Sequence, residues 1–266
     1  KIPPQKTARE KYRSLPKRVF TSCIFLSLLA VIIYLDLKQF EFPWSIATVT
    51  IVIGSLIVFE YYQMAIKSGQ SPFVKIGVFC TALLLATIPA QKILSLNQIN
   101  LTLEMLQIWV MVFSLIFCFY QQGKKTVCEK AFEGVASTIS GVIYIGLLGG
   151  YLIQIAWLPN IHPESNINGI HLLGFSILII KMTDIGAFMI GVAYGKHKWI
   201  PRISPGKSIE GLIGGVLSAT LLAIILNQFV WVIFDQYWKT IVFGLVIAYT
   251  GQLSDLVESI FKRSAD

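Results

Sequence analysis

Residues 181–215 read KMTDIGAFMIGVAYGKHKWIPRISPGKSIEGLIGG, and this stretch combines charged residues with two apolar segments. Lys181 and Asp184 lie three residues apart within an apolar run, so a helix would place them on one face. An ionisable group inside a membrane-spanning helix is costly and normally marks a functional site. A basic, glycine-containing loop follows, and a second apolar helix is expected to start at Glu210-Gly211. Together these features predict a phosphate-handling site at a membrane surface.

The composition predicts an all-α fold, a polytopic membrane helix bundle. Of the 266 residues, 55% are hydrophobic and only 14% are charged, and the mean hydropathy is +0.69. These values exclude an ordinary soluble protein. Because a spanning helix needs about 20 apolar residues, we expect about eight transmembrane helices. They lie near 19–35, 44–66, 73–90, 100–120, 135–158, 171–194, 211–229 and 238–261.

The distribution of Lys and Arg predicts the orientation of this bundle. Between these spans, one set of alternating segments carries only Lys38, Lys92 and Lys239, and Lys181 lies inside a span. All other Lys and Arg residues lie in segments on the opposite side: 1–18, 67–75, 121–134, 195–210 and 262–263. By the positive-inside rule the N-terminus and the 195–210 loop are cytosolic. The net charge of +8 therefore reflects topology and anionic lipid headgroups, and we expect no nucleic-acid partner.

Three parts of the chain are distinguished on this basis. Residues 1–18 form a basic cytosolic N-terminal segment, and residues 19–170 contain the N-terminal transmembrane helices. Residues 171–266 are expected to form the functional transmembrane region, with a cytosolic phosphate-binding loop and an incomplete C-terminus. The sequence leaves the oligomeric state open, a homodimer included.

The loop supplies the cations that crowded phosphates require: Lys196, Lys198, Arg202 and Lys207. Pro205 and Gly206 are expected to shape a turn, and Ser208 to cap a helix that begins at Ile209. The free N–H groups of that helix would add an anion site. The GKS tripeptide is not a Walker A loop, because no glycine lies five residues before Gly206 and no strand precedes it.

Carboxylates beside such a loop predict a divalent cation, Mg²⁺ first, with a second cation left open. Asp184 and Asp255 are the best-placed metal ligands, at the same ends of two spans. Asp255, Glu258 and Lys262 fall at i, i+3 and i+7, which is one stripe of a helix. A surface ladder of salt bridges would also explain Glu258 and Lys262, but it explains Asp255 less well because a fully apolar run precedes it.

At these residues the chain resembles the phosphatidate cytidylyltransferase (CDP-diacylglycerol synthase) family. One block contains D-I-G-A-F from Asp184, G-K-H-K from Gly195, and I-S-P-G-K-S-x-E-G from Ile203 to Gly211. A second block, G-x-L-x-D-L-x-E-S-x-x-K-R, runs from Gly251 to Arg263. The order and spacing of both blocks are specific, and the resemblance covers about the last third of the chain.

The resemblance implies a membrane nucleotidyltransferase of phospholipid synthesis that joins CTP and phosphatidate into CDP-diacylglycerol and releases pyrophosphate. It implies a bacterial-type plasma membrane enzyme with Mg²⁺. Asp184, Lys207, Asp255 and Glu258 would be catalytic, with Asp184 and Asp255 at the metal. The residues that bind substrate or hold the loop would be Lys196, Lys198, Arg202, Ser204, Pro205, Ser208, Glu210, Gly211, Lys262 and Arg263.

The family signature continues beyond Arg263 into further metal-binding aspartates that the printed sequence does not contain. We therefore expect a truncated sequence, inactive by itself, of an active parent enzyme. Two alternatives stay open. A transporter of an anionic solute would suit Lys181 and Asp184 but predicts inverted repeats, and none is visible. A polyprenol or lipid kinase-like enzyme shares the architecture but matches the loop less well.

Overall fold

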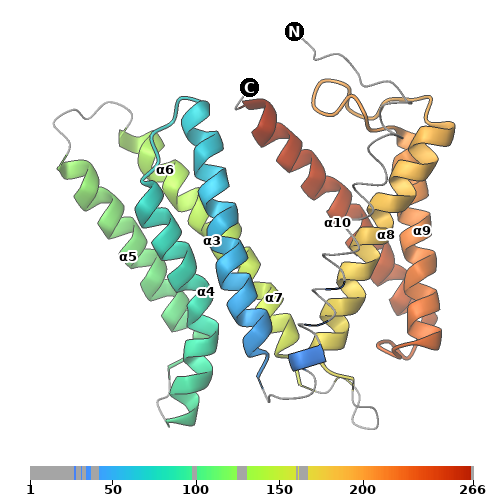
Figure 1. Cartoon of the computed structure of the whole chain (residues 1–266), viewed down its shortest axis with the longest axis horizontal. Helices are drawn as coiled ribbons and strands as arrows, with labels where there is room; N and C mark the ends of the chain where they lie inside the picture. The colour runs from blue at the N-terminus through green and yellow to red at the C-terminus, as the bar shows by residue number, and fades with distance from the viewer. Residues whose placement is uncertain are drawn as a thin grey trace. The chain divides into compact units, whose positions relative to one another are not determined.

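The structure is a computed structural model that describes residues 27, 31, 34–36, 42–97, 101–124, 131–159, 161 and 167–264. Helices dominate this part of the chain (Figure 1). It contains no β-strand, and its β-pairing is limited to an isolated bridge between Lys198 and Ser208. The predicted all-α fold is confirmed.

Seven helical spans in the described residues are long and apolar enough to cross a membrane. A backbone in hydrocarbon has no water to bond, so such segments satisfy their own N–H and C=O groups as helices. The spans are α3 (Trp44–Lys67), α4 (Val74–Leu96), α5 (Leu103–Gly123), α6–η1–α7 (Ala131–Ala156), α8 (Gly169–Tyr194), α9 (Ile209–Phe229) and α10 (Tyr237–Ser264). Each coincides with a predicted span, and the predicted span 19–35 lies largely outside the described residues.

Two spans differ in detail from the prediction. The span expected at 73–90 continues as α4 beyond Pro89 to Leu96. A proline removes one backbone donor and crowds the preceding turn, but membrane helices tolerate it. The helix ends later, where Asn97 Nδ2 donates to the carbonyl of Ile93 at 2.9 Å. The span expected at 135–158 begins earlier, as α6 (Ala131–Gly141), and contains the π-helical segment η1 (Val142–Leu147) before α7 (Leu148–Ala156). Hydropathy carries no signal for such a segment.

The chain divides into two compact units, one with α3 to α7 and the other with α8 to α10. The predicted division into 1–18, 19–170 and 171–266 stays a prediction. In the α3–α7 unit, Tyr62 is fully buried and donates from its hydroxyl to the carbonyl of Thr138 at 2.7 Å. The Thr138 hydroxyl accepts the N–H of Phe73 at 2.8 Å. These two bonds attach α3 and the start of α4 to α6.

A buried acid fixes the start of α3. Asp36 is only 1% exposed, and its two carboxylate oxygens accept the N–H groups of Ser45 at 3.0 Å and Ile46 at 2.8 Å. The first N–H groups of a helix have no partner within it, so Asp36 satisfies two of them. The carboxylate also complements the positive end of the helix dipole.

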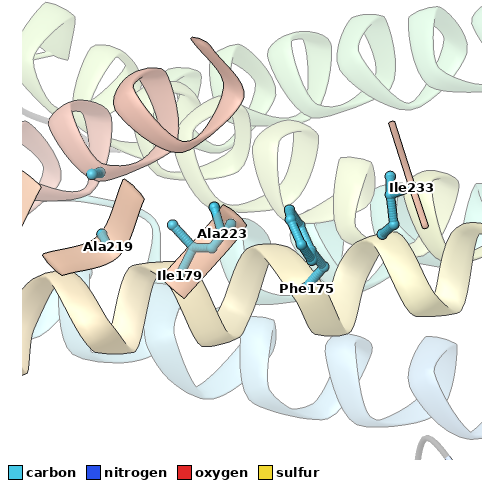
Figure 2. Packing of buried hydrophobic residues seen from close by; sticks show 6 residues of the cluster. Phe175, Ile179, Ala219, Ala223 and Ile233 are labelled. Carbon is cyan, nitrogen blue, oxygen red and sulfur yellow. The ribbon is translucent and has the colours of Figure 1, made fainter. Parts of the chain in front are cut away.

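The α8–α10 unit has a core of large side chains set against alanines. Phe175 and Ile179 of α8 meet Ala219 and Ala223 of α9 (Figure 2), and Ile233 and Ala248 complete the buried cluster. At one end of the unit, Asn227 Oδ1 accepts the N–H groups of Ile233 at 3.0 Å and Phe234 at 2.9 Å. This side chain fixes the connection from α9 to α10. The three helices of the unit run alternately up and down.

Candidate active site

The loop between α8 and α9 is a narrow turn-back held by its own backbone. Trp199 donates its N–H to the carbonyl of Lys207 at 3.1 Å, and Ile209 donates to the carbonyl of His197 at 2.9 Å. Within the loop, Lys207 donates its N–H to the carbonyl of Ser204 at 3.2 Å, which closes the turn expected at Pro205 and Gly206. The loop therefore presents its side chains from a fixed backbone.

Two side chains secure the end of this loop where α9 begins. Ser208 is buried, and its Oγ accepts the N–H of Gly211 at 3.2 Å, which confirms the predicted cap. Glu210 accepts the N–H of His197 at 3.1 and 3.2 Å through its two oxygens. His197 Nδ1 also lies 2.6 Å from Glu210 Oε1. Glu210 thus ties the first residues of the loop to its last, although its role with substrate stays a prediction.

Glycines let α8 and α9 pack backbone against backbone. A Cβ added to Gly215 would lie 2.7 Å from the carbonyl oxygen of Thr183, and one added to Gly211 would lie 2.8 Å from that of Ala187. Real Cβ atoms are not found this close, so a larger residue would push the helices apart. The glycines of α9 thus allow close packing with α8, and this packing fixes the height of the loop against Asp184.

Helix α10 brings the second acid to the same level. Gly251 of α10 packs against Ile180 of α8, with an added Cβ placed 3.8 Å from Ile180 Cγ2. The two helices run in the same direction, and Asp184 and Asp255 each lie four residues, or about one turn, further on. Asp184 interacts electrostatically with Asp255 and with Lys207. The two acids predicted at the same ends of two spans therefore lie close enough to interact.

Lys207 reaches from the loop to this pair of acids. Its Nζ lies 3.2 Å from Asp255 Oδ2 and donates to the carbonyl of Gln252 at 3.3 Å. Its side chain is 21% exposed, against 47% for Asp255. On α8, Lys181 Nζ is 4.0 Å from Asp184 Oδ2, and the two side chains are 48% and 44% exposed. The site thus contains two carboxylates and two ammonium groups, only one pair of which is in close contact.

The end of α10 contacts the loop elsewhere. Arg263 Nε donates to the carbonyl of Ile203, so this predicted residue holds the loop backbone. Glu258 and Lys262 form an ion pair with each other across one turn, and both are largely exposed. This is the surface pair that the sequence left open for them, and a catalytic role for Glu258 stays a prediction.

The remaining cations of the loop point into solvent. Lys196, Lys198 and Arg202 are exposed, and none of them forms an ion pair with another described residue. Positive charge that the described residues do not neutralise stays available to an anionic ligand. Their role in binding substrate stays a prediction.

The residues present fit a magnesium ion that shares its shell with substrate. Within the described residues no group of three His, Cys, Asp or Glu side chains gathers to form a metal cage. Mg²⁺ commonly takes only one or two carboxylates and completes its shell with water and substrate phosphate. Asp184 and Asp255 supply that number beside a basic loop, so they would hold the ion.

Sequence reasoning missed two contributors to this site. His197, which contacts Glu210, was predicted only as part of a basic loop. Thirteen residues separate it from Glu210, so no local pattern connects the two. Gln252 is buried and offers its carbonyl to Lys207. Because this contribution is a backbone carbonyl, the identity of the Gln252 side chain carried no signal for it.

Comparison with known proteins bears on what this site does. The model of the Cytidylyltransferase family matches residues 16–266. A protein of Staphylococcus epidermidis named phosphatidate cytidylyltransferase is 30% identical over 241 residues, which is 82% of this chain and 85% of the relative. The protein of that name from Chlamydia pneumoniae is 28% identical over 262 residues, 96% of this chain and 82% of the relative. A third, from Staphylococcus haemolyticus, is 31% identical with 82% and 85% covered.

Proposed function

This chain belongs to the Cytidylyltransferase family, as the resemblance predicted, and we propose that it is an integral membrane phosphatidate cytidylyltransferase. It would transfer the cytidylyl group of CTP to phosphatidate, giving CDP-diacylglycerol and pyrophosphate. The observation that carries the proposal is the meeting of Asp184, Asp255 and Lys207 inside a bundle of membrane helices. Relatives named for this activity align over most of the chain.

The reaction requires little of the protein beyond placement and charge. An oxygen of the lipid phosphate attacks the α-phosphorus of CTP, and the bond from that phosphorus to the oxygen bridging toward the β-phosphorus breaks. Pyrophosphate leaves with the bridging oxygen. Because the attacking oxygen is already anionic, no side-chain nucleophile is needed. Rate then comes from alignment and from cations that stabilise the developing charge.

Lys207 is the residue best placed to serve the nucleotide. Its backbone is held in the loop turn, and its ammonium group lies beside Asp255. A triphosphate arriving from the loop side offers more negative charge than one carboxylate, so Lys207 would exchange Asp255 for phosphate oxygens. Asp255, released from this ion pair, and Asp184 would hold Mg²⁺, which neutralises charge on the phosphates when bound.

The outer loop would guide CTP to this point. Lys196, Lys198 and Arg202 provide an exposed positive surface, which raises the local concentration of an anionic substrate. The start of α9 adds N–H groups directed at the loop. We place this loop and the N-terminus in the cytosol, where CTP is found, from the Lys and Arg asymmetry alone. Bacterial relatives support a bacterial plasma membrane.

Label position in CTP tests the reaction class directly. The full-length protein would be incubated in detergent micelles with phosphatidate, Mg²⁺ and CTP labelled at either the α- or the γ-phosphorus. We expect α-label in the organic-soluble product and γ-label in released pyrophosphate. γ-Label in the lipid would indicate a kinase instead, and no lipid label under any metal condition would favour the transporter.

Variants then locate the site. Lys207→Ala is expected to reduce α-label transfer by about 100-fold, the usual cost of removing a charge-stabilising donor. Lys75→Ala, an exposed lysine near the start of α4, is the matched control and should leave the rate unchanged. Equal rates for both variants would remove Lys207 from the site.

A further inference from the structure

Lys181 is a cation in an unusual position that the proposed chemistry has not yet used. It lies at the midpoint of α8, thirteen residues and about 20 Å along the axis from the end at Tyr194. A charged side chain at such a depth is costly in hydrocarbon and is retained where it meets an anion. The described structure offers it one carboxylate, Asp184, at 4.0 Å.

This contact is looser than the equivalent one on the loop side. Lys207 lies 3.2 Å from its carboxylate, also binds a backbone carbonyl, and is 21% exposed. Lys181 is 48% exposed. A lysine ammonium group has three donors, so Lys181 retains most of its capacity for another oxygen-bearing group. The two lysines therefore differ in how fully their charge is satisfied by the protein.

Charge balance at the site points to the missing partner. When Asp184 holds a divalent cation, its negative charge is shared with that ion, and the attraction it offers Lys181 is weaker. Lys181 then needs a second anion at the same level of the membrane. The triphosphate approaches from the loop, and Lys181 lies one turn further from the loop than Asp184. An anion that arrives from the membrane side can therefore reach Lys181 more directly than the triphosphate can.

We propose that Lys181 binds the phosphate group of the lipid substrate and holds it against the Asp184–Asp255 site. This inference rests on the proposed function. It divides the two lysines by substrate, with Lys207 on the nucleotide side and Lys181 on the lipid side. The lipid phosphate is thereby placed between Lys181 and the metal-binding acids, where its oxygen can face the α-phosphorus.

Kinetics that separate the two substrates test the division. Lys181→Met keeps the unbranched stem without its charge and suits hydrocarbon, so the helix is expected to persist. We expect the KM for phosphatidate, varied as its mole fraction in micelles, to rise about tenfold or more, as for the loss of a charge-assisted hydrogen bond. The KM for CTP should stay within about twofold. Lys181→Arg should recover most of the loss, and Lys239→Ala, at the opposite end of α10, should behave as wild type.

Direct binding makes the result independent of turnover. Labelled phosphatidate would be titrated into the full-length protein with Mg²⁺ but without CTP, with phosphatidylcholine as the competing lipid. We expect saturable binding by wild type, about tenfold weaker binding by Lys181→Met, and little change in Lys207→Ala. This pattern would support the inference even if wild type transferred no cytidylyl group, which would contradict only the proposed function.

Two results would overturn the inference. One is that Lys181→Met binds phosphatidate as tightly as wild type does, when the two proteins have the same melting temperature. The other is a variant whose Mg²⁺ requirement rises while its KM for phosphatidate does not change, because that would make Lys181 only a neutralising partner of Asp184. If Lys181→Met fails to fold, the same comparison is made with Lys181→Gln.

Discussion

The two units of this protein treat an acid in a membrane bundle in opposite ways. In the α3–α7 unit, Asp36 is 1% exposed and both of its oxygens accept backbone N–H groups at the start of α3. In the α8–α10 unit, Asp184 is 44% exposed, and the nearest ammonium group among the described residues is 4.0 Å away. The first carboxylate is satisfied by the fold, whereas the second has capacity left for a ligand.

The difference separates acids that stabilise from acids that act. A buried carboxylate with good hydrogen bonds contributes to stability, and removing it leaves unpaired backbone donors. A half-exposed carboxylate beside another acid contributes little to stability. Under the proposed function, it is retained in a membrane bundle because a cation or substrate would complete it. Both acids carry the same charge, so what distinguishes them is how many groups of the protein bind each carboxylate.

The largest effect is expected at the acid that Lys207 contacts. Asp255→Asn should reduce cytidylyl transfer by at least about 100-fold, because the amide cannot supply a charged ligand to a divalent cation. Its melting temperature should change little, since a partly exposed ion pair contributes about 1 kcal/mol or less. Asp235→Asn, before α10 and exposed, is the control. Near-wild-type transfer by Asp255→Asn would place the metal elsewhere.

Helix packing in the α8–α10 unit gives the next effect, on stability. Gly215→Ala should destabilise the fold by about 1–3 kcal/mol, because its Cβ would lie 2.7 Å from a backbone oxygen. Gly123→Ala is the matched change in α5, where an added Cβ meets nothing within 4 Å. It should be neutral or slightly stabilising. Thermal unfolding in detergent compares the two, and equal melting temperatures would mean that α8 and α9 are not this close.

Asp36→Ala should act on stability alone. Loss of the cap leaves two N–H groups of α3 unsatisfied and should cost about 1–2 kcal/mol. Cytidylyl transfer per folded molecule should remain that of wild type. Denaturation followed by intrinsic fluorescence gives the first quantity and the labelled-CTP assay the second. A folded variant with impaired transfer would mean that the α3–α7 unit also takes part in the chemistry.

The smallest effect is expected where the loop is tied to itself. Glu210→Gln keeps an acceptor for the N–H of His197 but loses the charge beside its ring. Since the His197 side chain is largely exposed, the pair contributes little in water. We expect the KM for CTP to rise no more than about fivefold, without change in the KM for phosphatidate. A loss as large as that of Asp255→Asn would instead assign Glu210 a direct contact with substrate.

Hydropathy and charge alternation predicted the spans because both follow from the bilayer as solvent. The α8–α9 site was predictable for a related reason. An acid within an apolar run is costly wherever it lies, so Asp184 and Asp255 are conspicuous in the sequence itself. Gly215 carries a similar signal in the sequence, because small residues in membrane helices indicate close approach.

Other features depend on contacts between distant residues and left no local pattern. In the sequence, Asp36 has the pattern of an ordinary loop acid. Its role appears only in the fold, where it accepts N–H groups at the start of α3. The capture of Asp255 by Lys207 joins residues 48 positions apart. The π-helical turn at Val142–Leu147 packs against α4 through Val142, and its apolar residues have the same hydropathy as those of an α-helix.

A matched pair of acids tests the central claim most directly. Transfer of α-labelled cytidylyl groups to phosphatidate would be measured per folded molecule for wild type, Asp184→Asn and Asp36→Ala. The structure predicts loss of transfer by about 100-fold or more in Asp184→Asn, with the fold intact, and wild-type transfer by the folded fraction of Asp36→Ala. Wild-type transfer by Asp184→Asn, or an equal loss in both variants, would contradict the division between structural and functional acids.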